Sequence, residues 1–234
     1  MAEVLTHREF HRKPNLSDVI LGGQDGLVNV LGLVLGVAAS SGDQNIILAA
    51  GFAAALAESV SMGAVAYTSL LAKAEHYESE YKREEREVIE MPEKEKAETR
   101  EIYRRFGFEG EVLEKIVETV SKDKAQWVNL MMSEELRLEP IDRSTIFKSS
   151  LVVGVATVVG SIIPIIPFLI TSDIFLGIIS SVIISGLALF GVGVYKAKVS
   201  VGVWYKSGLQ MFIIGMVAAA VGYLVGLLFN VESV

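Results

Sequence analysis

The chain has no cysteine, and only three of its 234 residues are histidine. The first absence excludes disulfides and thiolate metal sites, and the second leaves too few imidazoles for a histidine-rich zinc or copper site. Carboxylates and methionines are therefore the available metal ligands. Walker A, Gly-x-Ser-x-Gly, His-Glu-x-x-His and Glu-x-x-His motifs are also absent, so neither ATP hydrolysis nor hydrolase or di-iron oxidase activity is expected. The sequence predicts a protein that is not an enzyme.

Long apolar runs dominate what is present. The chain is 51% hydrophobic with a mean hydropathy of +0.46, and a membrane-spanning helix needs about 20 apolar residues. Five runs reach that length, which predicts an all-α, polytopic membrane protein with five transmembrane helices. The predicted spans are residues 18–40, 45–71, 146–170, 174–195 and 209–229.

Positive charge in the short connections predicts the orientation. Lys and Arg gather in the N-terminal segment and between the fourth and fifth spans: Arg8, Arg12, Lys13, Lys196, Lys198 and Lys206. The opposite connections, residues 41–44 and 171–173, contain neither residue type. Because cytosolic loops are enriched in Lys and Arg, the N-terminus and the segment between spans two and three are predicted to face the cytosol. The C-terminus is then predicted to lie outside.

Residues 73–143 form a strongly charged block with 20 acidic and 14 basic residues. This acidic excess favours cations over nucleic acid as partners. Apolar residues recur in the block at helical spacing, which predicts a compact helical domain rather than a linker. Its expected helices are residues 72–90, 92–106, 109–121 and 124–138. The predicted organisation is a cytosolic N-terminal segment (1–17), two spans (18–72), a cytosolic helical metal-binding domain (73–143) and three spans (144–234).

Within the block, two pairs of glutamates three residues apart flank Pro92, and a Met-Met pair precedes a further glutamate. Residues three apart share one helix face, and the turn at Pro92 can fold two such faces together. The candidate metal ligands are Glu84, Glu87, Glu95, Glu98, Met131, Met132 and Glu135. We expect the two methionines to be exposed on a charged helix. Spacing alone leaves an ordinary solvated acidic helix as the alternative interpretation.

Four further polar or soft residues accompany the first two spans: Asp18, Asp25, Glu58 and Met62. Acids inside spans are rare and usually face a cavity or a partner, which favours a translocation path. Asp18 and Asp25 share a helix face, as do Glu58 and Met62. Alternatives stay open: Asp25 could cap a helix broken at residues 22–23, Glu58 could be a protonated acid bonded to a neighbouring helix, and Met62 could be ordinary apolar filling.

Glycines spaced four residues apart recur in the first and last spans. The pairs are Gly22 and Gly26, Gly32 and Gly36, and Gly222 and Gly226. Such pairs let helices approach closely and often mark an association face, so a homodimer is one interpretation. The other is that glycine is simply frequent in membrane helices.

Three segments together resemble the vacuolar iron transporter family: residues 18–27 (DVILGGQDGL), 61–63 (SMG) and 125–140 (AQWVNLMMSEELRLEP). The likeness extends from about residue 16 to the C-terminus. It implies a homodimer that moves Fe²⁺, and often Mn²⁺, out of the cytosol in exchange for protons. It also implies that the seven candidate ligands of the charged block form a cytosolic metal-binding domain.

The resemblance assigns Asp25 and Met62 to the translocation path as its acid and its thioether. One position departs from the family pattern, which has an acid two helical turns before the methionine where this chain has Ala54. Glu58 lies one turn closer on the same face and could substitute.

The sequence thus favours a proton-coupled antiporter that exports Fe²⁺ or Mn²⁺, with Co²⁺ and Zn²⁺ also compatible with carboxylate and thioether ligands. The alternative function is a membrane-anchored metal sensor or buffer without transport. Because no targeting signal is evident, the expected location is the plasma membrane.

Overall fold

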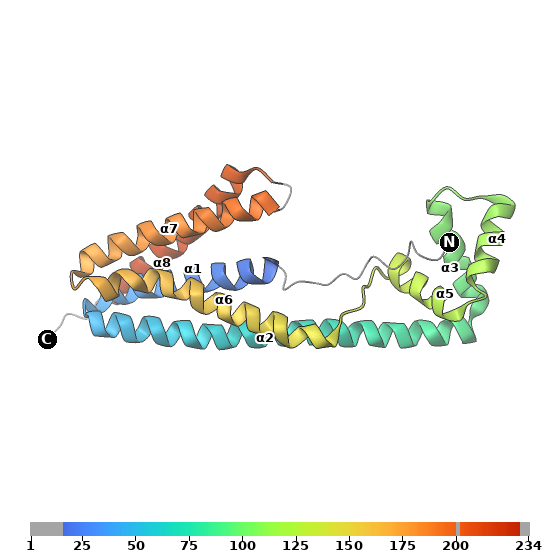
Figure 1. Ribbon diagram of the computed structural model, residues 1–234, viewed down its shortest axis with the longest axis horizontal. Coiled ribbons are helices and arrows are strands. Elements are labelled where there is room, and N and C mark those ends of the chain that lie inside the picture. Colours follow the sequence, from blue (N-terminus) through green and yellow to red (C-terminus); the bar gives the residue numbers. More distant parts are fainter. Residues whose placement is uncertain (1–15, 200–201, 230–234) are drawn as a thin grey trace. The chain divides into compact units, whose positions relative to one another are not determined.

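The computed structural model describes residues 16–199 and 202–229, and the regular structure within them is helical (Figure 1). The predicted N-terminal segment, residues 1–17, lies outside these ranges except for its last two residues. The elements are α1 (Leu16–Ser41), α2 (Gln44–Glu90), α3 (Pro92–Arg105), α4 (Gly110–Val120), α5 (Lys124–Leu130), the π-helix η1 (Met131–Glu135), α6 (Arg143–Ile170), α7 (Ile174–Val199) and α8 (Trp204–Leu228).

The chain divides into two compact units. One contains the described residues up to Tyr67 and from Phe147 onward, and the other is Thr68–Ile146. We call these the membrane unit and the insert unit. Helix α2 contributes to both, because it continues without a break from its apolar half into its charged half. The assignment of residues 73–143 as a cytosolic metal-binding domain stays a prediction.

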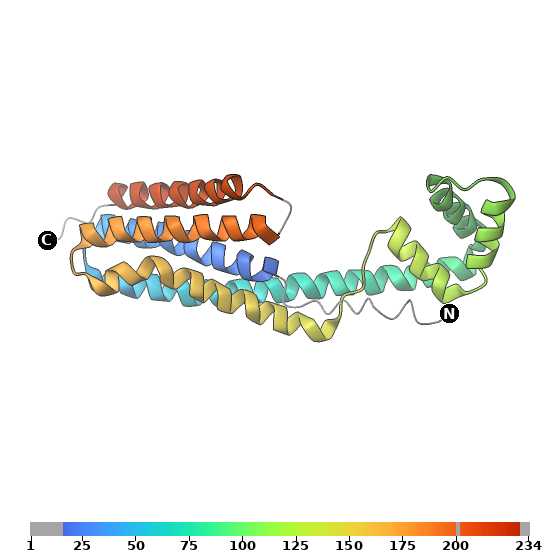
Figure 2. The same cartoon turned by 45° about the horizontal axis from the view of Figure 1, so that its top comes forward.

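Five helices are long and apolar enough to cross a membrane: α1, α2, α6, α7 and α8. This confirms the predicted all-α fold with five candidate spans. In the membrane unit α7 lies beside α8, and α1 packs against both (Figure 2). Large apolar side chains such as Val60, Leu151, Ile183 and Leu224 are exposed on these helices. Outward apolar surface of this extent is what lipid-facing helices require.

The glycine pairs are used to pack α1 within the chain. A Cβ on Gly222 would lie 2.0 Å from the carbonyl oxygen of Gly32, and one on Gly226 would lie 2.1 Å from that of Gly36. At the start of α1, a Cβ on Gly26 would lie 2.3 Å from a main-chain carbonyl oxygen of α6. Any larger residue at these positions would force the helices apart. The predicted homodimer therefore gains no support from these motifs.

The insert unit has a small core of its own. Its buried residues come from α2, α3, α5 and η1: Val88, Ile102, Trp127, Val128, Met131 and Met132. Pro92 stands at the first position of α3, so α2 stops just before it. Gly107 and Gly110 have φ of 88° and 61°, which lets the chain turn between α3 and α4 at little steric cost. These breaks follow the predicted helix boundaries closely.

Candidate metal centre

Three glutamates from three different elements meet in the insert unit. Carboxylate oxygens of Glu84 on α2, Glu95 on α3 and Glu135 in η1 all lie within 4.8 Å of one another. Glu84 is 2% exposed and Glu95 is 0% exposed, whereas Glu135 is open to solvent. The Oε2 atom of each of these two buried side chains has no hydrogen-bond partner within the described residues. Buried carboxylate oxygens without partners are costly unless a proton or a cation reaches them.

The turn at Pro92 creates this arrangement. Since α2 ends at Glu90 and α3 starts at Pro92, the chain changes direction at Met91 and brings the Glu84 carboxylate within 4.8 Å of that of Glu95. We call this turn, with the ends of α2 and α3 that flank it, the α2–α3 hairpin. Glu87 and Glu98 lie on the same two faces, nearer the surface, and both are half-buried. The two glutamates of each pair therefore lie on the sides of α2 and α3 that face each other.

Two cations from the same hairpin neutralise these acids. The Nζ atom of Lys94 lies 3.1 Å from Glu87, 3.3 Å from Glu98 and 3.4 Å from Glu95. The guanidinium of Arg83 lies 3.1 Å from Glu84 and 3.5 Å from Glu87. Neither basic residue was singled out from the sequence, although Lys94 lies four residues before Glu98 on one helix face.

Burial and like charge make two of the carboxyls hold protons more tightly than usual. Burial raises the pKa of Glu95 to about 7, and the charges of Glu98 and Glu84 add to the effect. Partial burial of its carboxyl group raises the pKa of Glu135, although the residue as a whole is exposed, and Glu98 and Glu84 are again the neighbouring charges. A hydrogen bond from Lys94 instead holds the pKa of Glu87 below its ordinary value. Near neutral pH the Glu95 carboxyl is therefore only partly ionised.

The two methionines are buried, which corrects the expectation that they are exposed. Met131 is 0% exposed and Met132 is 1% exposed, because both pack into the small core of the insert unit. The Met131 Sδ lies 3.7 Å from the hydroxyl of Thr99, which itself accepts a hydrogen bond from the Trp127 indole at 2.8 Å. Thr99 also donates to the main-chain carbonyl of Glu95 at 2.7 Å. The Thr99 hydroxyl thus lies between the Met131 sulfur and the main-chain carbonyl of Glu95.

A π-helix places the last candidate ligands. The predicted helix 124–138 stops being an α-helix at Leu130, and the next five residues form η1. The Leu136 N–H donates to the Met131 carbonyl five residues earlier at 3.1 Å, and Arg137 then turns the chain with φ of 55°. The two methionines of η1 pack in the core, whereas Glu135 of the same element reaches the acids of the hairpin. Single π turns inside α-helices are often found at functional sites.

The VIT family profile matches residues 16–227 of this sequence. The chain belongs to the VIT family. It is 32% identical over 219 residues to Vacuolar iron transporter 1 of Eucalyptus grandis, an alignment that covers 93% of this chain and 88% of the relative. Vacuolar iron transporter 1 of Oryza sativa subsp. japonica is 32% identical over 216 residues, 92% of this chain and 86% of that protein. Protein CCC1 of Saccharomyces cerevisiae is 26% identical over 216 residues, 89% of this chain and 67% of that protein. The resemblance seen in the sequence is therefore confirmed.

The acids of the membrane unit also meet in this VIT-family chain. The Asn29 side chain of α1 donates a hydrogen bond to the Glu58 carboxyl of α2, and Glu58 interacts with the Asp25 carboxyl. Helix α1 runs unbroken past residues 22–23, so Asp25 does not cap a broken helix. Asp18 and Met62 are half-buried and are not part of this contact. Asn29 was missed from the sequence, although it follows Asp25 by four residues and so shares its helix face.

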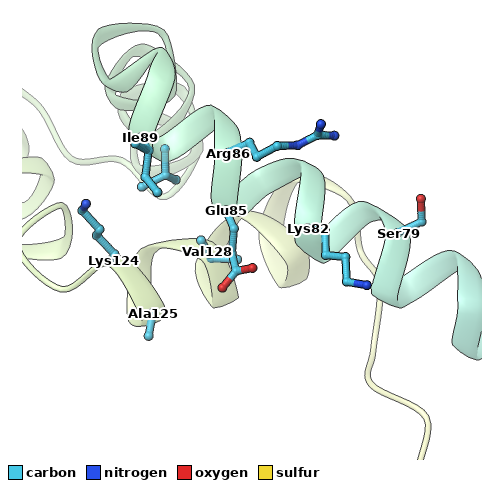
Figure 3. A pocket seen from close by; sticks show the side chains of 9 residues that line it. Ser79, Lys82, Glu85, Arg86, Ile89, Lys124, Ala125 and Val128 are labelled. Atoms are coloured by element: carbon cyan, nitrogen blue, oxygen red, sulfur yellow. The ribbon is translucent and has the colours of Figure 1, made fainter.

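A cavity of about 830 Å³ lies in the insert unit between α2 and α5 (Figure 3). Its lining includes Lys82, Glu85 and Arg86 of α2 and Lys124 of α5, and none of the seven candidate ligands. Helical spacing places Glu85 about 100° and Arg86 about 200° around α2 from Glu84. In this VIT-family chain the acids therefore gather away from the cavity, at the α2–α3 hairpin.

Proposed function

We propose that the chain is a proton-coupled antiporter that exports Fe²⁺, and also Mn²⁺, from the cytosol. The observation that carries the proposal is the meeting of Glu84, Glu95 and Glu135 within 4.8 Å, with two buried oxygens unpaired, in a chain with five candidate spans. Membership of the VIT family, whose plant members compared above are named iron transporters, supports metal ion transport. Those names also agree with a protein that is not an enzyme.

The first step is collection of the ion in the insert unit. The glutamates supply hard oxygen ligands and Met131 and Met132 supply soft sulfur, a combination that suits Fe²⁺ and Mn²⁺ and also admits Co²⁺ and Zn²⁺. Because both sulfur atoms are buried, the carboxylates Glu87, Glu98 and Glu135 meet the incoming ion first. The ion also neutralises acids that repel one another in its absence.

Transfer through the membrane unit is assigned to Asp18, Asp25, Met62 and Glu58. Two ionised carboxyl groups in contact repel each other, so a proton or a metal ion bound between Asp25 and Glu58 offsets the repulsion, and the two cations compete for the pair. A metal ion that binds the pair displaces this proton. Protons arriving from the outer side then displace the metal, which couples export of one ion to import of the other.

The orientation remains that of the sequence: the N-terminus and residues 73–143 in the cytosol, the C-terminus outside, and two copies per transporter. The expected location in the plasma membrane receives no support from the names of the relatives. The relatives from Eucalyptus grandis and Oryza sativa are named vacuolar transporters, which favours an internal membrane with the same cytosolic face.

The test is Fe²⁺ entry into proteoliposomes under a pH gradient, with internal pH recorded at the same time. We expect metal entry coupled to proton exit in the wild type, at least tenfold slower in Asp25→Asn because the metal and proton ligand is lost. Asp173→Asn is the matched control, since this carboxylate lies in the loop where it caps α7 by accepting from the Leu176 N–H at 3.1 Å. Normal coupled transport by Asp25→Asn would contradict the proposed translocation path.

A membrane-anchored metal sensor or buffer is the second candidate function. It needs the glutamates of the insert unit and leaves the Asp25–Glu58 pair without a role. Stoichiometric metal binding by the purified protein, with no metal flux in the liposomes at any pH gradient, would favour this candidate over transport.

A further inference from the structure

An ammonium group lies against three of the seven candidate ligands. The Nζ of Lys94 lies 3.1 Å from Glu87 Oε2, 3.3 Å from Glu98 Oε1 and 3.4 Å from Glu95 Oε1. All three partners are candidate metal ligands. A single positive charge thus lies where carboxylates of both α2 and α3 converge.

Arg83 has a different environment. Its shortest ion pair, 2.8 Å, is with Glu80, which is not a candidate ligand. It reaches the ligand Glu84 at 3.1 Å with one arm of a planar guanidinium. Since a guanidinium forms fixed, forked contacts while an ammonium is a compact point charge, Lys94 is the cation that most resembles a bound ion.

We propose that Lys94 is a resident cation of the metal centre, which a divalent ion must displace in order to bind. Lys94 then sets the affinity of the site and its discrimination between divalent and monovalent ions. The inference rests on the proposed function only in requiring that the glutamate cluster takes a metal.

The geometry makes the exchange feasible. Lys94 is 51% exposed, so its flexible stem can carry the ammonium into water, while Glu95 remains fully buried. A divalent ion interacts with the same carboxylates about twice as strongly as a single charge at equal distance, whereas Na⁺ or K⁺ offers no charge advantage over the ammonium. The lysine therefore excludes monovalent ions and lowers the affinity for divalent ones.

Helix α3 provides a matched control in Lys96. This residue is two positions away and forms an ion pair of 2.8 Å with Glu93, outside the candidate ligand set. Substituting either lysine removes one charge and one set of exposed ion pairs from the same helix. Only Lys94 has all its ion-pair partners among the proposed ligands.

The experiment is titration of the purified full-length protein with Mn²⁺ at neutral pH, for the wild type, Lys94→Met and Lys96→Met. We expect Lys94→Met to bind Mn²⁺ about tenfold more tightly, because the incoming ion no longer has to break the three ion pairs of Lys94. Each of these ion pairs is worth about a few-fold in affinity. Lys96→Met should bind like the wild type. Added Na⁺ should weaken binding to Lys94→Met more than to Lys96→Met, a difference that a purely structural role would not produce.

The outcomes separate the two ideas. Wild-type protein that binds no Mn²⁺ overturns the metal centre itself. If the wild type binds Mn²⁺ and Lys94→Met binds it with equal or weaker affinity, the proposed displacement of Lys94 is overturned, whereas the metal centre is not. If Lys94→Met loses helical content, Lys94→Gln, which keeps a polar side chain without the charge, replaces it under the same criterion.

Discussion

Glu95 combines a fully buried side chain with an oxygen that has no hydrogen-bond partner in the described chain. Its neighbours add charge of its own sign from Glu84 and Glu98, and Lys94 only partly offsets them. A carboxyl in this position must hold a proton or a cation at neutral pH. If the cluster binds a metal ion as proposed, Glu95 is the residue at which proton and metal compete most directly.

Metal binding should weaken as the pH falls through about 7, the raised pKa of Glu95. The sign follows from the raised value: below it Glu95 keeps its proton and cannot ligate, whereas an ordinary glutamate would remain ionised down to about pH 4.5. Mn²⁺ titrations between about pH 5.5 and 8 check this. At the upper end of this pH range, Glu95→Gln should bind Mn²⁺ several-fold more weakly than the wild type, and its affinity should change less with pH. Glu101→Gln, an exposed position on α3, should follow the wild type; a wild-type profile in Glu95→Gln would contradict the prediction.

Three of the glutamates that spacing singled out lie together in the structure, and spacing could indicate them because residues three apart on a helix share a face in any fold. It could not predict that Glu84 and Glu95 are buried while Glu135 is exposed, since burial depends on how the hairpin packs. Lys94 and Thr99 were missed for the same reason: spacing gives the face of a residue but not its partner. Asn29 could have been found, as a polar residue four positions after an intramembrane acid.

At the scale of elements, helix boundaries marked by Pro92, Gly107 and Gly110 were predictable because their backbone restrictions are local. The π-helix η1 was not, since its sequence has the composition of an ordinary helix and its wide turn depends on packing against the insert core. The expectation that the methionines are exposed was wrong because their burial depends on packing against the insert core, which spacing does not reveal.

Deleting Ser133 should convert η1 into α-helix and leave metal affinity near that of the wild type. A π turn contains about one residue more than an α turn, so removing the exposed Ser133 restores the α-helical repeat and keeps Glu135 on the helix face that it occupies. We expect Mn²⁺ affinity well above that of Glu135→Gln, with helical content near that of the wild type by circular dichroism. Ser133→Ala is the control, since it removes only the hydroxyl bonded to the Leu130 carbonyl at 3.2 Å. An affinity as low as that of Glu135→Gln would show that the wide turn of η1 itself positions Glu135.

At the scale of the whole molecule, the five spans and the charged insert were predictable from composition, because length and hydropathy decide which helices can cross a bilayer. The use of the glycine pairs was not. Their spacing is the same whether helices of one chain or of two chains approach, and here Gly222 faces Gly32 within the chain. The glycine pairs are therefore occupied within the chain and are not available to a second copy.

The two units should contribute separately to transport. If the insert unit collects the ion, the double variant Glu84→Gln and Glu95→Gln should raise the metal concentration for half-maximal flux about tenfold or more while leaving the maximal rate near that of the wild type.

If the Asp25–Glu58 pair carries the coupled exchange, Glu58→Gln should lower the maximal rate about tenfold, because the amide keeps the bond with Asn29 but cannot exchange a proton. Metal affinity at the glutamate cluster of the insert unit should not change. Flux in proteoliposomes and metal titration of the same preparations measure both quantities. A double variant without flux at saturating metal, or a changed cluster affinity in Glu58→Gln, would mean that the two sites act as one.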